Sequence, residues 1–313
     1  MVKITTVKTT FSAGEVSSDL LGRGDLRAYD NGAGKLRNVF IQPTGGVVRR
    51  AGLRHVAPAA GTGRLIAFEF NTIQTYLLVV THLQIAIYAN GVLEATISSP
   101  WSTTDISQIA WMQSADTLLL LHPDYPSKKL TRTGAGTWSI SDWDFYTKAN
   151  RISQPMYKFA ATPVTLTPSA VSGSITLTAS AAVFSAGHVG TRLRVSNKEV
   201  IITAVSSATV VSATVVESLI SVTATIDWEE QAFSAVRGYP ITATFHQDRL
   251  VIGGSRDLPN RIWMSQSGDL FNFDLGTGLD AEAIEFGIFS DQINAIRGVF
   301  SGRHLQVFSS GAE

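Results

Sequence analysis

Short runs of alternating apolar and polar residues, separated by turn-forming residues, limit the fold of this 313-residue chain more than any other feature. A period of two places every second side chain on the same face of a strand. Within the stretch 228–276, the intervening segments are rich in Gly, Asp, Ser and Gln, residues that favour turns. We therefore predict one four-stranded sheet there, with strands at residues 241–245, 249–252, 261–265 and 270–273.

The same four-run pattern occurs twice earlier in the chain. The first set covers residues 64–70, 75–81, 83–89 and 92–98, and the second covers 106–112, 117–121, 128–133 and 137–143. The two sets begin 42 residues apart, which is typical of the blades of a β-propeller. A further half set, at 293–300 and 305–309, predicts an incomplete propeller whose last blade is completed by a longer polypeptide or by a partner chain.

A different composition separates the second set from the third. Residues 160–191 contain no Asp, Glu, Lys or Arg. Alternation nevertheless continues at residues 174–178, 192–195, 200–205, 209–215 and 222–226, and it is too regular for a disordered linker. We predict a small β-barrel or β-sandwich inserted into the propeller.

The N-terminal region combines a strand pattern with a helical one. Residues 1–10 alternate as a short edge strand, and helical apolar spacing with Asp25 as N-cap predicts a helix over 25–38. Gly32 and Gly34 oppose that helix by up to about 1 kcal/mol each. The fold class is therefore mainly β with a short N-terminal helix. The expected domains are 1–60 (strand and helix), 61–155 (two blades), 156–229 (inserted domain) and 230–313 (third blade and start of the fourth).

Charge and cysteine content exclude several classes of function. The 25 Lys and Arg residues balance 25 Asp and Glu residues, so the total charge does not favour a duplex-binding surface or a membrane-attracted patch. No cysteine is present, which excludes disulfides, thiolate metal sites and a cysteine nucleophile. No run of 18 apolar residues and no apolar signal core occur, and we therefore expect no membrane anchor.

Motifs that carry catalysis are absent from the sequence. The six histidines show no metal-ligand spacing, and neither a phosphate-binding loop nor a nucleophile elbow occurs. We therefore predict no catalytic, cofactor-binding or metal-binding residue. Propeller glycosidases use two acids, so a hydrolase stays open as an alternative on two groups of carboxylates, although loop carboxylates are usually solvated. These groups are Asp280, Glu282 and Glu285, and Asp142 with Asp144.

Two ordered sets of residues resemble a known family. The first set includes Phe11, Gly14, Glu15, Gly22, Arg23, Asp25, Asn38, Arg50 and Gly52. The second includes Arg237, Gly238, Tyr239, Pro240, Arg249 and Trp263, and the chain ends in Phe308-Ser309-Ser310-Gly311-Ala312-Glu313. In this order, over nearly the whole chain, they resemble the nozzle proteins of short-tailed bacteriophages, also called tail tubular protein B. Members of that family are usually longer and continue beyond the final segment.

The resemblance implies a structural virion protein of the phage tail, synthesised in the host bacterial cytoplasm. Its expected form is a homohexameric tube below the portal and adaptor ring, in contact with other tail proteins. This tube would retain genomic DNA and then conduct double-stranded DNA, without sequence specificity, during ejection. A neutral chain suits a conduit, because each neutralised phosphate adds salt-dependent affinity. The alternatives are a host-receptor or carbohydrate-binding tail module that uses the inserted domain and, less favoured, the propeller hydrolase.

Overall fold

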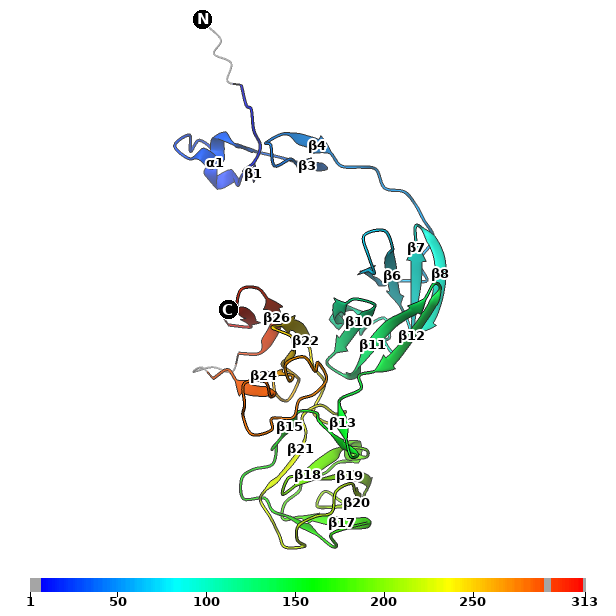
Figure 1. The fold of residues 1–313 in the computed structure, drawn as a ribbon. Coiled ribbons are helices and arrows are strands. Elements are labelled where there is room, and N and C mark those ends of the chain that lie inside the picture. Colours follow the sequence, from blue (N-terminus) through cyan, green and yellow to red (C-terminus); the bar gives the residue numbers. More distant parts are fainter. Residues whose placement is uncertain (1–6, 290–293, 312–313) are drawn as a thin grey trace, which may run out of the picture. The chain divides into compact units, whose positions relative to one another are not determined.

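The computed structural model describes residues 7–289 and 294–311, and almost all of its regular elements are strands (Figure 1). Contacts divide the chain into two compact units, residues 1–57 and 58–313. We call them the N-terminal unit and the second unit. The fold is mainly β, as predicted.

The N-terminal unit is built from very short elements. Strand β1 (Gly14–Glu15) pairs in parallel with β2 (Gly32–Ala33), and β3 (Val39–Ile41) pairs antiparallel with β4 (Val47–Arg49). A 3₁₀ turn spans Ser18–Leu20, and helix α1 spans Arg27–Asp30. Among the described residues of this unit only two glycines are buried, so it has no buried apolar side chain.

The helix predicted over residues 25–38 is wrong in length, because α1 is a single turn. A Cβ atom at Gly32 would lie 2.0 Å from Cγ2 of Val16 and 2.8 Å from the carbonyl oxygen of Ala28. This glycine therefore permits a close approach of two chain segments, and the chain enters β2 instead of continuing the helix. The predicted edge strand fails over residues 7–10, which form no strand, and residues 1–6 lie outside the described part.

Two antiparallel meanders begin the second unit. The first contains β5 (Arg64–Glu69), β6 (Thr75–Thr81), β7 (Gln84–Ala89) and β8 (Val92–Ser98). The second contains β9 (Ala110–Ser114), β10 (Thr117–His122), β11 (Tyr125–Gly134) and β12 (Thr137–Asp142). The strand predicted from residue 106 starts later, because Ile106–Gln108 is a 3₁₀ turn. Its three-residue period buries both Ile106 and Ile109.

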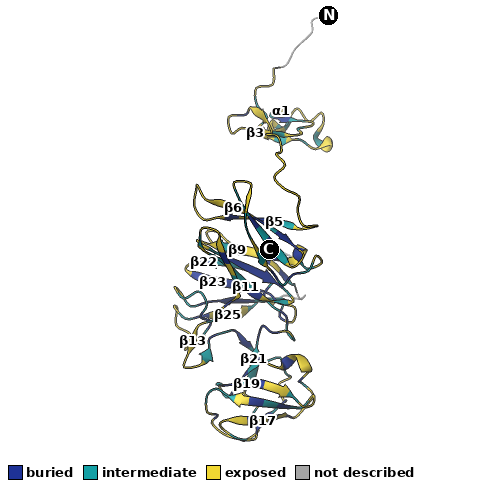
Figure 2. Ribbon diagram, turned by 90° about the vertical axis from the view of Figure 1, so that its right-hand side faces the viewer, coloured by how far each residue is buried: buried dark blue, intermediate teal, exposed yellow. Residues whose placement is uncertain are grey.

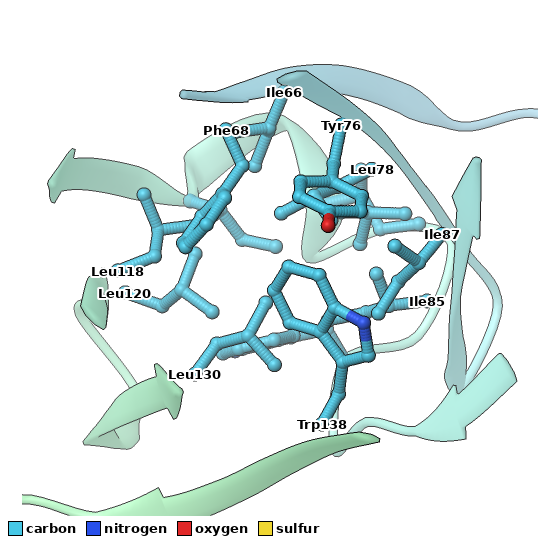
Figure 3. Close-up of a cluster of buried hydrophobic side chains, with 14 residues drawn as sticks. Ile66, Phe68, Tyr76, Leu78, Ile85, Ile87, Leu118, Leu120, Leu130 and Trp138 are labelled. Atoms are coloured by element: carbon cyan, nitrogen blue, oxygen red, sulfur yellow. The ribbon is translucent and has the colours of Figure 1, made fainter. Parts of the chain in front are cut away.

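A hydrophobic core fills the space between these two meanders (Figure 3). The rings of Phe68, Tyr76 and Trp138 meet edge to face, with centroids 5.0–6.1 Å apart. Alternation along β10 sends Leu118 and Leu120 into this core. Its neighbours Leu119 and Leu121 enter another core, shared with strands that follow residue 241. Strand β10 is therefore buried on both faces, which explains its continuous apolar sequence.

A seven-stranded antiparallel sheet follows, with strand order β15-β21-β18-β19-β20-β17-β16. Its strands are β15 (Met156–Tyr157), β16 (Leu166–Pro168), β17 (Ser174–Ala179), β18 (Arg192–Val195), β19 (Lys198–Val205), β20 (Val210–Val215) and β21 (Trp228–Gln231). The short β13 (Thr147–Lys148) and β14 (Arg151–Ile152) precede it, and a 3₁₀ turn spans Ala186–His188. Its first and last strands in the chain, β15 and β21, are paired.

Two expectations for this sheet are corrected. The sheet does not close into a barrel, because the end strands β15 and β16 are not paired with each other in the described chain. Residues 222–226 form only one isolated bridge, between Thr225 and Leu166. The Oγ atom of Ser221 accepts a hydrogen bond from the N–H of Thr223 at 2.8 Å, so a local turn replaces strand pairing there.

The last four-stranded sheet contains β22 (Thr242–His246), β23 (Arg249–Gly253), β24 (Arg261–Met264) and β25 (Ile284–Gly287). The strand predicted at residues 270–273 is wrong. There Asn272 bonds to Gln266 and Asp269 within a turn, while Phe273 is buried in the core. The following β26 (Ile296–Ser301) and β27 (Leu305–Ser309) pair with each other, whereas residue 293 of the predicted strand lies outside the described residues. Figure 2 shows that burial is concentrated in these sheets.

Candidate functional site

A small pocket lies where the seven-stranded sheet meets the β22–β25 sheet. Its volume is about 240 Å³, and its polar lining comes from both sheets. The polar and aromatic side chains that dominate it are Tyr157, Arg194, Glu229, Arg261, Trp263 and Glu285. Pockets for drug-sized ligands are typically about 300–1,000 Å³, so this one fits at most a small polar molecule or one edge of a larger ligand.

Arg261, Glu285 and Arg194 of this pocket make contacts with protein groups. Nη1 of Arg261 lies 2.6 Å from Oε1 of Glu285, and its guanidinium lies 4.5 Å from the ring centre of Tyr157. Burial raises the pKa of Glu285, and the opposing charge of Arg261 limits the rise. Arg194 donates to the carbonyl oxygen of Ile152 at 3.1 Å, while burial lowers the pKa of its guanidinium. The pair of Arg261 and Glu285 lies within the β22–β25 sheet, and the contact of Arg261 with Tyr157 connects this sheet to the seven-stranded one.

A second charged cluster joins the same two regions. Nη2 of Arg237 donates to Oε1 of Glu230, which is buried in β21, and Nη1 lies 3.4 Å from Oδ2 of Asp257. Nε2 of the buried His188 lies 3.2 Å from Oε2 of Glu230. The guanidinium of Arg237 is 4.1 Å from the ring centre of Phe159. Removing Arg237 would leave the buried carboxylate of Glu230 without its guanidinium partner.

The residues that follow Arg237 connect two sheets through their backbone. Gly238 has a φ of +82°, and a Cβ atom there would lie 2.8 Å from Cβ of Arg256. The N–H of Tyr239 donates to the carbonyl oxygen of Pro123, in the turn between β10 and β11, at 2.8 Å. Pro240 is buried next to the start of β22. The Arg-Gly-Tyr-Pro motif is therefore a packed connection between β21 and β22.

Arg249 and Trp263 also serve packing. The buried guanidinium of Arg249 donates to the carbonyl oxygens of Ser265 and Glu282, each at 2.6 Å, and to that of Asp280. It thereby fixes the long loop between β24 and β25 onto β23. The ring of Trp263 is almost fully buried and meets Phe233 edge to face at 4.9 Å.

The other residues of the family motif lie in the N-terminal unit and form local contacts. Arg23 and Asp25 make an exposed two-bond ion pair, and Glu15 accepts hydrogen bonds from the backbone of Leu36 and the side chain of Arg37. The remaining contacts are the N–H of Phe11 with the carbonyl of Gly45, the pairing of Gly14 in β1, and Asn38 with Arg50. Gly22 and Gly52 are exposed. No acid–base pair of catalytic type is formed by these residues.

The carboxylates considered for a hydrolase have separate partners. Asp142 pairs with Lys128, and Asp144 pairs with Lys129. The carboxylate of Glu282 accepts backbone hydrogen bonds from Thr277 and Leu279, whereas Asp280 is exposed. Glu285 pairs with Arg261 and lines the pocket. Asp142, Asp144 and Glu282 thus make loop and sheet contacts, and of these five carboxylates Glu285 is the one in the pocket lining.

Sequence analysis missed the acids and the histidine that fill the junction. Glu229 lines the pocket with Glu285, while Glu230 and His188 are buried in the neighbouring cluster. Glu199 is also fully buried and pairs with Arg192. For Glu230 alternation was the available signal, because it follows the buried Trp228 by two residues and so lies on the same face of β21. Burial of such a carboxylate requires an opposite charge.

The described residues hold neither a metal-binding cluster nor a membrane-spanning helix. Within residues 7–289 and 294–311, no group of three or more His, Asp or Glu side chains is placed to hold a metal ion. In the same residues no helix has the length and apolar character needed to cross a membrane. Comparison with protein-family models finds no match to this chain, and comparison with curated proteins finds no significant match.

Proposed function

We propose that the chain is a structural virion protein of a bacteriophage tail, forming the nozzle that retains genomic DNA and conducts it during ejection. The observation that carries this proposal is that the charged motif residues of the second unit make structural contacts. Arg237 pairs with Glu230 and Asp257, and Arg249 donates to backbone carbonyl oxygens, so both side chains hold sheets and loops together. Side chains that hold sheets together suit a protein that transmits mechanical load. The ordered motif residues also resemble those of the nozzle family.

The arrangement of sheets supports a propeller in this proposal. Strands β5–β8, β9–β12 and β22–β25 act as three blades, and β26–β27 begin a fourth. A blade between two others must bury both faces, and β10 sends alternate leucines into two different cores. The seven-stranded sheet acts as the inserted domain, because its first and last strands pair and the chain leaves and returns at neighbouring positions.

The proposed partners follow from a conduit role. The chain assembles as a homohexamer below the portal and adaptor ring, contacts other tail proteins, and meets double-stranded DNA only in transit. Balanced charge keeps the affinity for phosphates low, since each neutralised phosphate strengthens binding and slows passage. In this role the protein is not an enzyme and needs no cofactor.

Electron microscopy tests the proposal directly. Negatively stained images of the purified protein, and of purified tails labelled with antibodies against it, are expected to show six-fold rings at the position of the nozzle. A variant that lacks residues 160–227 serves as a control, and its rings should persist with a smaller outline. A protein that is monomeric at every concentration and missing from purified virions would contradict the proposal.

A carbohydrate-binding tail module is the second candidate, supported by the pocket at the junction. Tyr157 beside charged Arg194 and Glu229 provides the mixture of an aromatic ring and polar groups that small polar ligands require. Glycan binding that is lost in Glu229→Gln, together with weaker adsorption to host cells, would favour this function. Adsorption that is unchanged in Glu229→Gln and after deletion of residues 160–227 would count against it.

A further inference from the structure

The neutral chain is divided into two oppositely charged parts. Residues 1–57 contain nine Lys and Arg residues and four Asp and Glu residues, a formal charge of +5. Since the whole chain has no net charge, residues 58–313 carry −5. These ranges are the two compact units. Opposite charges on two units of one chain favour association between the basic unit of one copy and the acidic unit of another.

The N-terminal unit presents an apolar surface beside its positive charges. Phe40 of β3 and Val48 of β4 are directly opposite each other and share one face of the hairpin, with 62% and 49% of their surfaces exposed. The adjacent Ile41 is on the other face, near Gly14. Arg49 and Arg54 are exposed close by in the sequence. We call residues 39–54 the basic hairpin.

The second unit presents a surface of matching character. Residues 262–289 contain no Lys, Arg or His but five acids, namely Asp269, Asp274, Asp280, Glu282 and Glu285. Within this segment Leu279 has 67% of its surface exposed, and Ile284 and Phe286 are exposed on the same face of β25. In the described chain β25 pairs only with β24, so it is an edge strand of its sheet. We call residues 279–287 the acidic edge.

We infer that the basic hairpin of one copy docks onto the acidic edge of a second copy of this chain. The apolar side chains would cover each other, while Arg49 and Arg54 would face the acids. The hairpin lacks a core of its own, and an edge strand offers unpaired backbone groups to a partner strand. Residues 50–63 are all exposed, and these fourteen residues can span about 45 Å when extended, which is enough to reach a neighbouring molecule.

The contact is heterologous, because the surface on one copy differs from the surface on the other. Repetition of a heterologous contact generates a closed ring or an open filament. This inference rests on the proposed function for the claim that the chain self-assembles, and it adds the two surfaces that meet. Each copy keeps one hairpin and one edge, which allows the two surfaces to be inactivated separately.

Two full-length variants test the contact by native mass spectrometry and light scattering. The hairpin variant carries Phe40→Asp and Val48→Asp, and the edge variant carries Ile284→Lys and Phe286→Lys. The wild-type chain should assemble at low salt, and each variant alone should be monomeric. An equal mixture should form heterodimers and nothing larger, because only one intact hairpin and one intact edge remain available to each other.

The matched control carries Leu65→Asp and Leu77→Asp, which replace apolar residues of β5 and β6 that are similarly exposed. Its assembly should equal that of the wild type. Circular dichroism verifies that each variant is folded. If an apolar substitution unfolds the chain, Arg49→Glu with Arg54→Glu should abolish assembly in its place, and Asp280→Lys with Glu282→Lys in a second chain should restore it on mixing.

The inference is overturned by a wild-type chain that stays monomeric at all salt concentrations, by folded variants that assemble normally, or by a mixture that stays monomeric. Failure of the tail function is separate: assembly that depends on both surfaces, in a protein missing from virions, would support the contact and reject the nozzle. A protein that is present in tails, and whose hairpin and edge variants assemble normally, would support the nozzle and reject the contact.

Discussion

The N-terminal unit and the first two meanders of the second unit are built from similar hairpins but differ in what holds them together. In the hairpin β3–β4, Phe40 is largely exposed, whereas Phe68 of β5 is completely buried. The N-terminal unit relies on turn hydrogen bonds and exposed ion pairs. A two-stranded hairpin is marginal alone in water. Alternating sequence therefore produces strands in both regions, but a hydrophobic core forms only where a second sheet covers the apolar face of the strands.

Truncating one aromatic ring in each unit should give the largest difference in the loss of stability between the two units. Phe68→Ala removes a ring whose centroid lies 5.0 Å from that of Trp138, and it should lower the free energy of unfolding of the second unit by about 3–5 kcal/mol. Phe40→Ala should change the stability of the isolated chain by less than about 0.5 kcal/mol. Urea unfolding followed by circular dichroism measures both. Equal losses would contradict the contrast between the units.

Breaking one ion pair in each unit should give a smaller difference in the loss of stability. Arg237→Leu leaves Glu230 buried without its guanidinium partner, and the expected loss is about 2–3 kcal/mol because Arg237 keeps some exposure to solvent. Arg23→Leu breaks the exposed pair with Asp25, and no measurable change is expected. Thermal unfolding of both variants provides the comparison. A stable Arg237→Leu variant would show that the buried cluster is dispensable.

The pH dependence of stability should give the smallest difference between the two units. The side chain and N–H of Ser102 donate to Asp105, with a further bond from Tyr125, and they lower the pKa of this carboxyl to about 2. Because the folded pKa lies below the unfolded value near 3.8, this stabilisation is present above pH 4 and is lost as the pH falls towards 2.

Asp105→Asn should therefore flatten the acid limb of the stability curve by about 1 kcal/mol after solvent screening. The matched substitution is Asp25→Asn, whose ion pair with Arg23 lowers the pKa of an exposed carboxyl. It should leave the acid limb of the second unit unchanged. Urea unfolding at several pH values between neutrality and acid checks both variants, and identical acid limbs in wild type and Asp105→Asn would refute the role of Ser102.

Strand alternation allowed most strands of the second unit to be predicted, because an apolar face there has a sheet to pack against. The predictions failed where another interaction competed with that pattern. At residues 270–273 the side chain of Asn272 stabilises a turn, and at Gly32 a close approach of two segments ends the helix. The spacing of apolar residues contains neither kind of information. The close approach at Gly32 depends on a segment that is distant in the sequence, and the turn at Asn272 depends on side-chain hydrogen bonds.

The candidate site was predictable only as a set of motif residues. Arg237 and Trp263 both lie at the junction between the seven-stranded sheet and the β22–β25 sheet, which sequence order alone could not establish. At this junction Glu230 lies 7 residues from its partner Arg237, and Glu285 lies 24 residues from its partner Arg261. Pairing of a buried charge with a particular opposite charge is a property of the packed sheets, and the local sequence does not encode it.

The burial of tryptophan in the second unit also determines how the two units can be followed in solution. All six tryptophans lie at or beyond residue 101, and Trp101 and Trp263 are almost fully enclosed. Tryptophan fluorescence of the chain therefore reports on the second unit, because the N-terminal unit contains no tryptophan. A single tryptophan at position 40, in place of Phe40, would give that unit its own emission and reveal when its surface becomes shielded from water.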